Sequence, residues 1–144
     1  MNSFNLKGKH LEIVKSYCYL GVTIKYTGNL NISSKLLMEK GRKAWFKIKK
    51  TVGLHSPCNL LEKLFDTLVV PIILYGCEIW GVDHCFKDSE PFEPLHIKFI
   101  KEILGVHCKA TNVACLAELN RYPLRGRIQL ATIKFSMFYT NKIF

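Results

Sequence analysis

Leu64-Phe-Asp-Thr-Leu-Val-Val-Pro-Ile-Ile-Leu-Tyr-Gly-Cys-Glu-Ile-Trp-Gly81 contains the longest uncharged apolar run of this 144-residue chain. The run itself, Thr67–Cys77, lies between Asp66 and Glu78. It is well below the roughly 18 residues that a membrane-spanning helix needs. Apolar residues occupy most of the circumference of a helix drawn through this stretch, which is typical of a helix buried at the centre of a bundle. We therefore predict a core helix here.

Start and stop signals surround this predicted helix. Ser56 is expected at the N-cap and Pro57 at the first helical position, where proline is favoured. Pro71 removes one backbone hydrogen bond, so the helix is expected to bend about one turn earlier. Gly76 leaves room for another helix to approach, and Gly81 is expected to end the run.

The preceding segment, 32–52, has helical periodicity with two distinct faces. Its apolar stripe comprises Leu37, Gly41, Ala44, Ile48 and Val52. Its second stripe, called the lysine face below, comprises Lys40, Lys43, Lys47 and Lys50. Ser33 or Ser34 can cap the start and Gly53 can end the segment. We predict one amphipathic helix.

The first thirty residues favour β structure instead. Leu6–Lys9 and Leu11–Val14 flank a turn at Gly8, and Tyr17–Ile24 is rich in strand-forming residues. We predict a small β-hairpin or two-stranded edge that ends at the turn 27–29. Two or three strands are marginal alone in water, so this element needs the helices or a neighbouring sheet.

Three more helices are predicted beyond the core helix. One begins near Ser89 with Pro91 in its first turn and ends at Gly105, a short one follows Thr111, and the last runs from Pro123 toward Lys142. The residues expected to face the core are Phe92, Leu95 or His96, Phe99 and Ile103 in the first of these helices. They are Val113, Leu116 and Ala117 in the second helix, and Leu124, Ile128, Ala131, Phe135 and Phe138 in the last. The fold class is mainly α, with an N-terminal β-hairpin followed by about five packed helices.

The net charge of +10 is concentrated in the first part of the chain. Residues 1–57 hold eleven lysines and arginines against two glutamates, whereas residues 58–144 hold ten against nine acidic residues. This asymmetry points to a polyanionic partner, with nucleic acid first and an acidic membrane surface second. The simpler alternative is a lysine-rich helix that only faces water.

Four sequence segments of this chain, and the order in which they follow one another, are similar to those of a known protein family. They are Ser16-Tyr-Cys-Tyr-Leu-Gly-Val-Thr-Ile24, the stretch 64–81 quoted above, Pro94-Leu-His-Ile-Lys-Phe-Ile-Lys-Glu-Ile-Leu-Gly-Val106 and Ala117-Glu-Leu-Asn-Arg-Tyr-Pro-Leu124. Together they resemble the reverse transcriptases of non-LTR (LINE-type) retrotransposons, in the region just after the catalytic palm. The resemblance covers nearly the whole chain. It implies that residues 1–30 are the end of the palm and residues 31–144 the helical thumb and connection.

The family's catalytic aspartates stand in an Asp-Asp strand turn, and this chain has no Asp-Asp pair. The resemblance therefore implies a non-catalytic fragment of an RNA-directed DNA polymerase, inactive alone. No cofactor is expected in this chain, although the parent polymerase would use Mg²⁺. The implied partners are an RNA–DNA hybrid or duplex nucleic acid and the missing palm domain.

Eight residues are candidates for nucleic-acid binding. The four amines of the lysine face can follow phosphates without reading sequence. Tyr19 and Gly21 belong to a turn that resembles the family's hairpin leading toward the primer terminus, where Gly21 would let a nucleic-acid strand approach the backbone. Arg121 and Arg125 form a second basic cluster together with Arg127, and the simpler alternative is that Arg125 and Arg127 only shield Glu118.

Neither a metal site nor a catalytic nucleophile is predicted. His84-Cys85 and His107-Cys108 are adjacent pairs, which rarely reach one tetrahedral ion, and the six cysteines include no Cys-x-x-Cys pair. Free thiols and the absence of a visible secretory signal favour an intracellular location, in the nucleus or cytoplasm. No membrane partner is expected.

A function of a different class stays open. The chain can be a stand-alone helical protein–protein interaction module derived from a decayed element, whose exposed apolar surface the palm once covered. Nucleic-acid affinity that falls steeply with salt separates the two hypotheses, since phosphate contacts produce it and an apolar interface does not.

Overall fold

The computed structural model describes residues 4–6, 8–11, 13–28, 30–85 and 92–143. The elements are, in chain order, β1 (Phe4–Leu6), β2 (Lys9–Leu11), β3 (Ser16–Tyr19), β4 (Val22–Lys25), α1 (Asn31–Val52), α2 (Cys58–Leu64), the π-helix η1 (Phe65–Val69), α3 (Val70–Ile73), α4 (Cys77–Cys85), α5 (Glu93–Leu104), α6 (Asn112–Glu118) and α7 (Leu124–Ile143). The predicted class, mainly α after an N-terminal β element, is confirmed. Within the described ranges, no helix has the length and apolar character required to cross a membrane.

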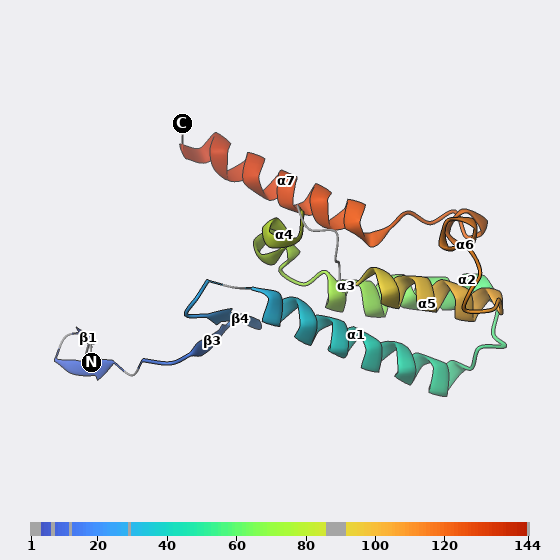
Figure 1. Cartoon of the computed structure of the whole chain (residues 1–144), viewed down its shortest axis with the longest axis horizontal. Coiled ribbons are helices and arrows are strands. Elements are labelled where there is room, and N and C mark those ends of the chain that lie inside the picture. Colours follow the sequence, from blue (N-terminus) through green and yellow to red (C-terminus); the bar gives the residue numbers. More distant parts are fainter. Residues whose placement is uncertain (1–3, 7, 12, 29, 86–91, 144) are drawn as a thin grey trace.

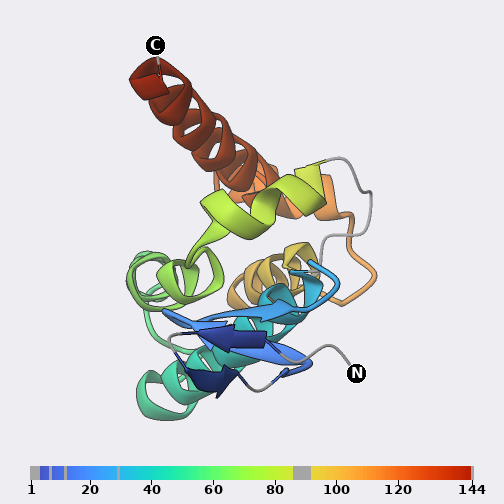
Figure 2. The ribbon, with the colours of Figure 1, turned by 90° about the vertical axis from the view of Figure 1, so that its left-hand side faces the viewer.

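The helices stack in levels. α1 lies on one side, α2, α3 and α5 lie in the middle, and α4 and α7 lie on the other side (Figure 1). α4 packs along α7, and α1 packs against α3. The C-terminal half of α7 projects beyond the other helices (Figure 2).

Within the described residues, the β structure consists of two antiparallel hairpins, whereas one hairpin or two-stranded edge was predicted. β1 pairs with β2, and β3 pairs with β4 so that Tyr19 stands opposite Val22. Leu20 and Gly21 form the second turn with φ of 47° and 81°. Positive φ at both central residues is the pattern of a type I′ turn, whose twist matches that of the strands.

Side-chain hydrogen bonds fasten the β3–β4 hairpin to the helices. Ser33 Oγ accepts from the Thr23 N–H at 2.6 Å and donates to the Thr23 carbonyl at 3.0 Å. The Tyr75 hydroxyl donates to the Leu20 carbonyl at 2.8 Å. The prediction that Ser33 or Ser34 caps α1 is wrong, because Leu30 occupies the N-cap position and makes no side-chain cap bond.

The core helix begins one residue later than predicted and contains a π-turn. Pro57 is at the N-cap position of α2, and the Ser56 hydroxyl bonds the Val52 carbonyl instead of capping. The irregularity expected before Pro71 is η1, where the Val70 N–H donates to the Phe65 carbonyl. Because proline cannot donate, the backbone adopts a wider turn just before it.

The core helix breaks at Gly76, not at Gly81 as predicted. Gly76 has φ of +65°, and α4 starts immediately after it. Gly81 lies within α4, where a Cβ would be 2.7 Å from Thr132 Oγ1 and 2.9 Å from Ile128 Cγ2 of α7. Glycine at position 81 therefore allows α4 and α7 to approach closely.

We expect Gly81→Ala to lower the free energy of unfolding by about 1–3 kcal/mol, because the added methyl group overpacks the α4–α7 contact. Gly126→Ala, within α7, is the matched control, since a Cβ there meets nothing within 4 Å. That change should be neutral or stabilise by up to about 1 kcal/mol. Denaturant unfolding of both variants provides the measurement, and equal destabilisation would contradict the close packing.

Aromatic side chains join three helical elements in the core. Trp45 of α1, Phe65 of η1 and Phe99 of α5 are all buried. The Phe65 and Phe99 rings stack with centroids 3.6 Å apart, and Trp45 meets the Phe99 ring edge-on at 4.9 Å. The Trp45 Nε1–H donates to Glu102 Oε2 at 2.8 Å. This cluster fixes the buried side of α1 and so determines which side faces water.

The C-terminal helices differ from the predictions in several respects. The predicted start of the third helix at Ser89 and Pro91 lies outside the described residues, and α5 begins at Glu93 and ends, as predicted, at Gly105. Four residues expected to face the core are exposed instead: Val113, Ala117, Phe135 and Phe138. Periodicity correctly predicted the helices in this region. It did not predict which of their turns are buried against the other described elements.

Candidate nucleic-acid interface

The lysine face forms on α1 as predicted. Lys40, Lys43, Lys47 and Lys50 all belong to this helix and are all exposed. At about 100° per residue, their positions fall within an arc of about 80°. On the opposite side Leu37 and Ile48 are buried and Ala44 is half-buried.

The charges of the lysine face are not neutralised within the described part of the chain. None of its four amines has a carboxylate partner there within ion-pair distance. Neighbouring cations of α1 differ, since Lys49 Nζ lies 3.0 Å from Glu102 Oε2 and Arg42 Nη1 lies 3.3 Å from Glu39 Oε2. The lysine face is thus a positive surface that attracts polyanions.

Two apolar side chains border this surface. Leu36 is 49% exposed and Phe46 is 64% exposed. Helical spacing places Leu36 within the lysine arc and Phe46 beside it. Neither predicted face of this helix included Leu36, although its spacing of four residues from Lys40 is a signal that could have revealed it.

Tyr19 and Gly21 lie in the β3–β4 hairpin, away from the lysine face in sequence and on a different element. Tyr19 is 60% exposed. A Cβ at Gly21 would lie 3.2 Å from Cε1 of Tyr75. On the side where a Cβ would project, the close approach allowed by Gly21 is made by the Tyr75 ring of the protein itself.

The Arg121 side chain is buried and does not belong to an exposed basic cluster. Its side chain is 8% exposed, and its guanidinium pairs with Asp66 and lies 3.8 Å from Glu62 Oε2. Its Nε–H donates to His96 Nε2 at 3.2 Å. The guanidinium carbon lies 5.3 Å from the Phe99 ring centroid. Arg121 thus fastens the 119–123 connection to α2, η1 and α5, and this buried, ion-paired position does not favour its predicted role in nucleic-acid binding.

The hydrogen bond from Arg121 also defines the proton position on His96. A guanidinium can only donate, so Nε2 is the unprotonated nitrogen and Nδ1 carries the hydrogen that faces Glu93 Oε1 at 3.3 Å. Glu93 Oε2 accepts the Leu124 N–H at 3.0 Å. Glu93 therefore connects the beginning of α5 to the beginning of α7, and His96 connects α5 to Arg121.

The other two arginines of the predicted cluster lie on α7. Arg127 Nη1 is 3.7 Å from Asp66 Oδ1, and its side chain is half-exposed. Arg125 is half-buried and lines a groove beside α5. The carboxylate that Arg127 approaches is Asp66 rather than the expected Glu118.

Among the described residues, no group of three or more His, Cys, Asp or Glu side chains lies close enough together to bind a metal ion. The side chains of His84 and Cys85 lie outside the described part of the chain. Partial desolvation raises the pKa of the Cys58 thiol, and the hydrogen bond and negative charge of Glu62 raise it further. The raised pKa lowers the thiolate fraction of Cys58, and the thiolate is the nucleophilic form.

Comparisons with protein-family models, curated proteins and solved structures give no match. Function is therefore inferred from the geometry of the lysine face and from the sequence resemblance described above.

Proposed function

We propose that this chain binds double-stranded nucleic acid through the lysine face, without sequence preference. The observation that carries the proposal is the group of four exposed amines in one narrow arc of α1, none of them paired with a carboxylate of the described residues. The resemblance to non-LTR retrotransposon reverse transcriptases gives this surface a role. It is that of the thumb-like part of an RNA-directed DNA polymerase, which holds the template–primer duplex while a separate palm and its Mg²⁺ ions transfer nucleotides.

The dimensions of the lysine face agree with phosphate binding. Lys50 stands ten positions after Lys40, which corresponds to about 15 Å along a helix. One strand of a DNA duplex rises about 3.4 Å along its axis for each phosphate, so the lysine face is long enough to meet more than one phosphate. Lysine is a flexible point charge without the fixed fork of arginine, which suits backbone contacts and not base recognition.

Binding to labelled duplexes and RNA–DNA hybrids tests this proposal. Fluorescence anisotropy should give affinities that fall steeply with salt and that hardly differ between unrelated base sequences. Affinity that does not respond to salt, or strong preference for one base sequence, would contradict phosphate binding.

The chain alone is expected to have no polymerase activity, because its sequence contains no Asp-Asp pair to hold the two metal ions of nucleotidyl transfer. Primer extension on a homopolymer template with Mg²⁺ or Mn²⁺ should yield no product. Extension that a point mutation within this chain abolishes would refute the prediction.

A protein–protein interaction module remains the second candidate, and the β3–β4 hairpin favours it. Tyr17, Leu20, Ile24 and Tyr26 are 62%, 73%, 41% and 78% exposed. Apolar surface of this kind is typical of a face that a partner covers. Under this alternative, nucleic acid should bind weakly and the lysine face should be a solvated surface only.

A further inference from the structure

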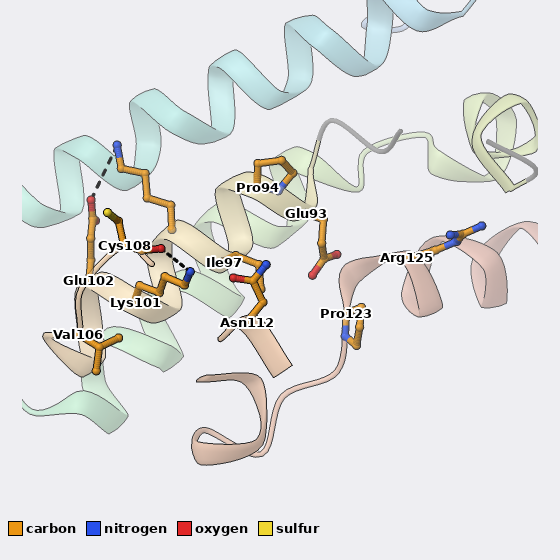
Figure 3. Close-up of a pocket in the computed structure, with 11 residues that line it drawn as sticks. Glu93, Pro94, Ile97, Lys101, Glu102, Val106, Cys108, Asn112, Pro123 and Arg125 are labelled. Carbon is orange, nitrogen blue, oxygen red and sulfur yellow. Dashed lines mark hydrogen bonds and ion pairs between the residues drawn. The ribbon is translucent and has the colours of Figure 1, made fainter. Parts of the chain in front are cut away.

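A groove lies between α5, the loop that follows it and the start of α7. Its volume is about 960 Å³, near the upper end of the roughly 300–1,000 Å³ found for ligand pockets. Figure 3 shows that its lining residues come from segments far apart in sequence, with Ile97 and Lys101 on α5, Val106 in the following loop, and Pro123 and Arg125 at the start of α7.

The lining combines apolar patches with positive charge. Pro94, Ile97, Val106 and Pro123 supply apolar surface, and Val106 is 40% exposed. Lys98, Lys101 and Arg125 supply the cations. A partner that covers this groove therefore gains most when it brings apolar side chains and negative charges together.

The two carboxylates among the described lining residues are already engaged. Glu93 faces the His96 ring with one oxygen and accepts the Leu124 N–H with the other. Glu102 accepts from Trp45 Nε1 and pairs with Lys49. Both therefore have less capacity to attract a basic ligand.

The groove lysines retain their charge for a partner. Lys101 Nζ donates to the Cys108 carbonyl at 2.7 Å, a neutral acceptor that does not cancel the charge. Lys98 Nζ lies 3.9 Å from Glu102 Oε1, and its side chain is 67% exposed. An exposed pair at this separation contributes little, so Lys98 can turn toward a bound carboxylate.

We propose that this groove binds an acidic amphipathic peptide segment of a partner protein. Apolar side chains of the segment pack on Ile97 and Val106 while its carboxylates face Lys98 and Lys101. A peptide is favoured over nucleic acid because the described lining residues include no aromatic ring on which a base can stack. The proposal does not depend on nucleic-acid binding by the lysine face.

Fluorescein-labelled peptides of about twelve residues provide the probe, with leucines at helical spacing and glutamates between them. One control peptide has lysine in place of glutamate, and another has serine in place of leucine. Only the acidic amphipathic peptide should bind. Ile97→Asn, and Lys98→Gln combined with Lys101→Gln, should each weaken binding about tenfold, and the effect of the lysine changes should shrink with added salt.

The variant with alanine at all four positions of the lysine face is the matched control, and it should bind the peptide as wild type does. Circular dichroism and thermal unfolding check that each variant folds. If Ile97→Asn is unstable, Lys98→Gln alone keeps the test, because this exposed side chain should weaken binding about threefold without affecting folding.

Three results would overturn the proposal. They are absence of binding by the acidic peptide, equal binding by the basic peptide, and affinity that none of the groove substitutions changes. Displacement of the peptide by a nucleic-acid duplex, together with loss of duplex binding in the groove variants, would assign the groove to nucleic acid instead.

Discussion

Arg121→Met should lower the free energy of unfolding by about 2–4 kcal/mol. The substitution leaves Glu62 without its guanidinium partner, leaves Asp66 with only the more exposed Arg127 at 3.7 Å, and removes the hydrogen bond that His96 Nε2 accepts. Methionine keeps an unbranched apolar side chain beside the Phe65 and Phe99 rings, so the change reports mainly on removal of the charge. The expected effect is below that of a fully buried pair, because Asp66 and Glu62 are 38% and 27% exposed. Denaturant unfolding followed by circular dichroism measures the difference.

Arg127→Met is the matched control, because Arg127 approaches the same carboxylate. Its side chain is 51% exposed and lies 3.7 Å from Asp66 Oδ1. Screening by water should limit its effect to less than about 1 kcal/mol. Asp66→Asn in the Arg121→Met background should recover part of the stability, since it removes a negative charge that only the half-exposed Arg127 still approaches. Equal destabilisation by the two arginine substitutions would show that Arg121 is not the central connection.

The helices and their faces could largely be predicted from the sequence, because they depend on local periodicity. The spacing of Lys40 to Lys50 against Leu37 and Ile48 defined the two faces of α1, and Gly53 and Gly105 marked helix ends that the structure confirms. These signals lie within the helix that they describe. No partner elsewhere in the chain is needed to interpret them.

The roles of Arg121 and Gly81 could not be predicted in this way, because they depend on distant residues. Arg121 meets a carboxylate 55 positions earlier in the sequence, so local charge counting grouped it with exposed arginines. Gly81 suggested a helix end, whereas its lack of a side chain serves the contact with α7. A glycine in a helical pattern can mark a helix end or a close contact with another helix, and the two cases differ only in whether a neighbouring helix packs against the glycine.

The exposed aromatic residues of α7 have a related explanation. Phe135 and Phe138 continue an apolar pattern that starts at Leu124 and Ile128. Leu124 and Ile128 are buried, whereas Phe135 and Phe138 are exposed. Figure 2 shows the C-terminal half of α7 extending past the body of the molecule. Periodicity identifies a helix face that prefers burial, but it does not determine how far neighbouring helices extend along that face.

Replacing all four residues of the lysine face with alanine should greatly reduce the salt dependence of nucleic-acid binding. Removal of one lysine–phosphate interaction with B-form DNA lowers the slope of log K against log salt by about 0.9, so four such interactions correspond to a reduction of up to about 3.6. Affinity should fall to a similar extent for every base sequence, because amine–phosphate interactions carry no base information. Anisotropy titrations over a range of salt concentrations measure both effects.

A second variant separates the lysine face from general charge. Three exposed lysines lie on other elements: Lys63 on α2, Lys109 in the loop that follows α5, and Lys134 on α7. Their replacement by alanine removes positive charge away from the lysine face. If the lysine face holds the duplex, the change in slope per substituted lysine is much larger in the four-alanine variant than in this control. Equal changes per lysine would mean that the duplex senses only net charge. In that case α1 merely presents solvated lysines, and the interaction-module hypothesis gains the stronger support, because its apolar surfaces do not depend on these amines.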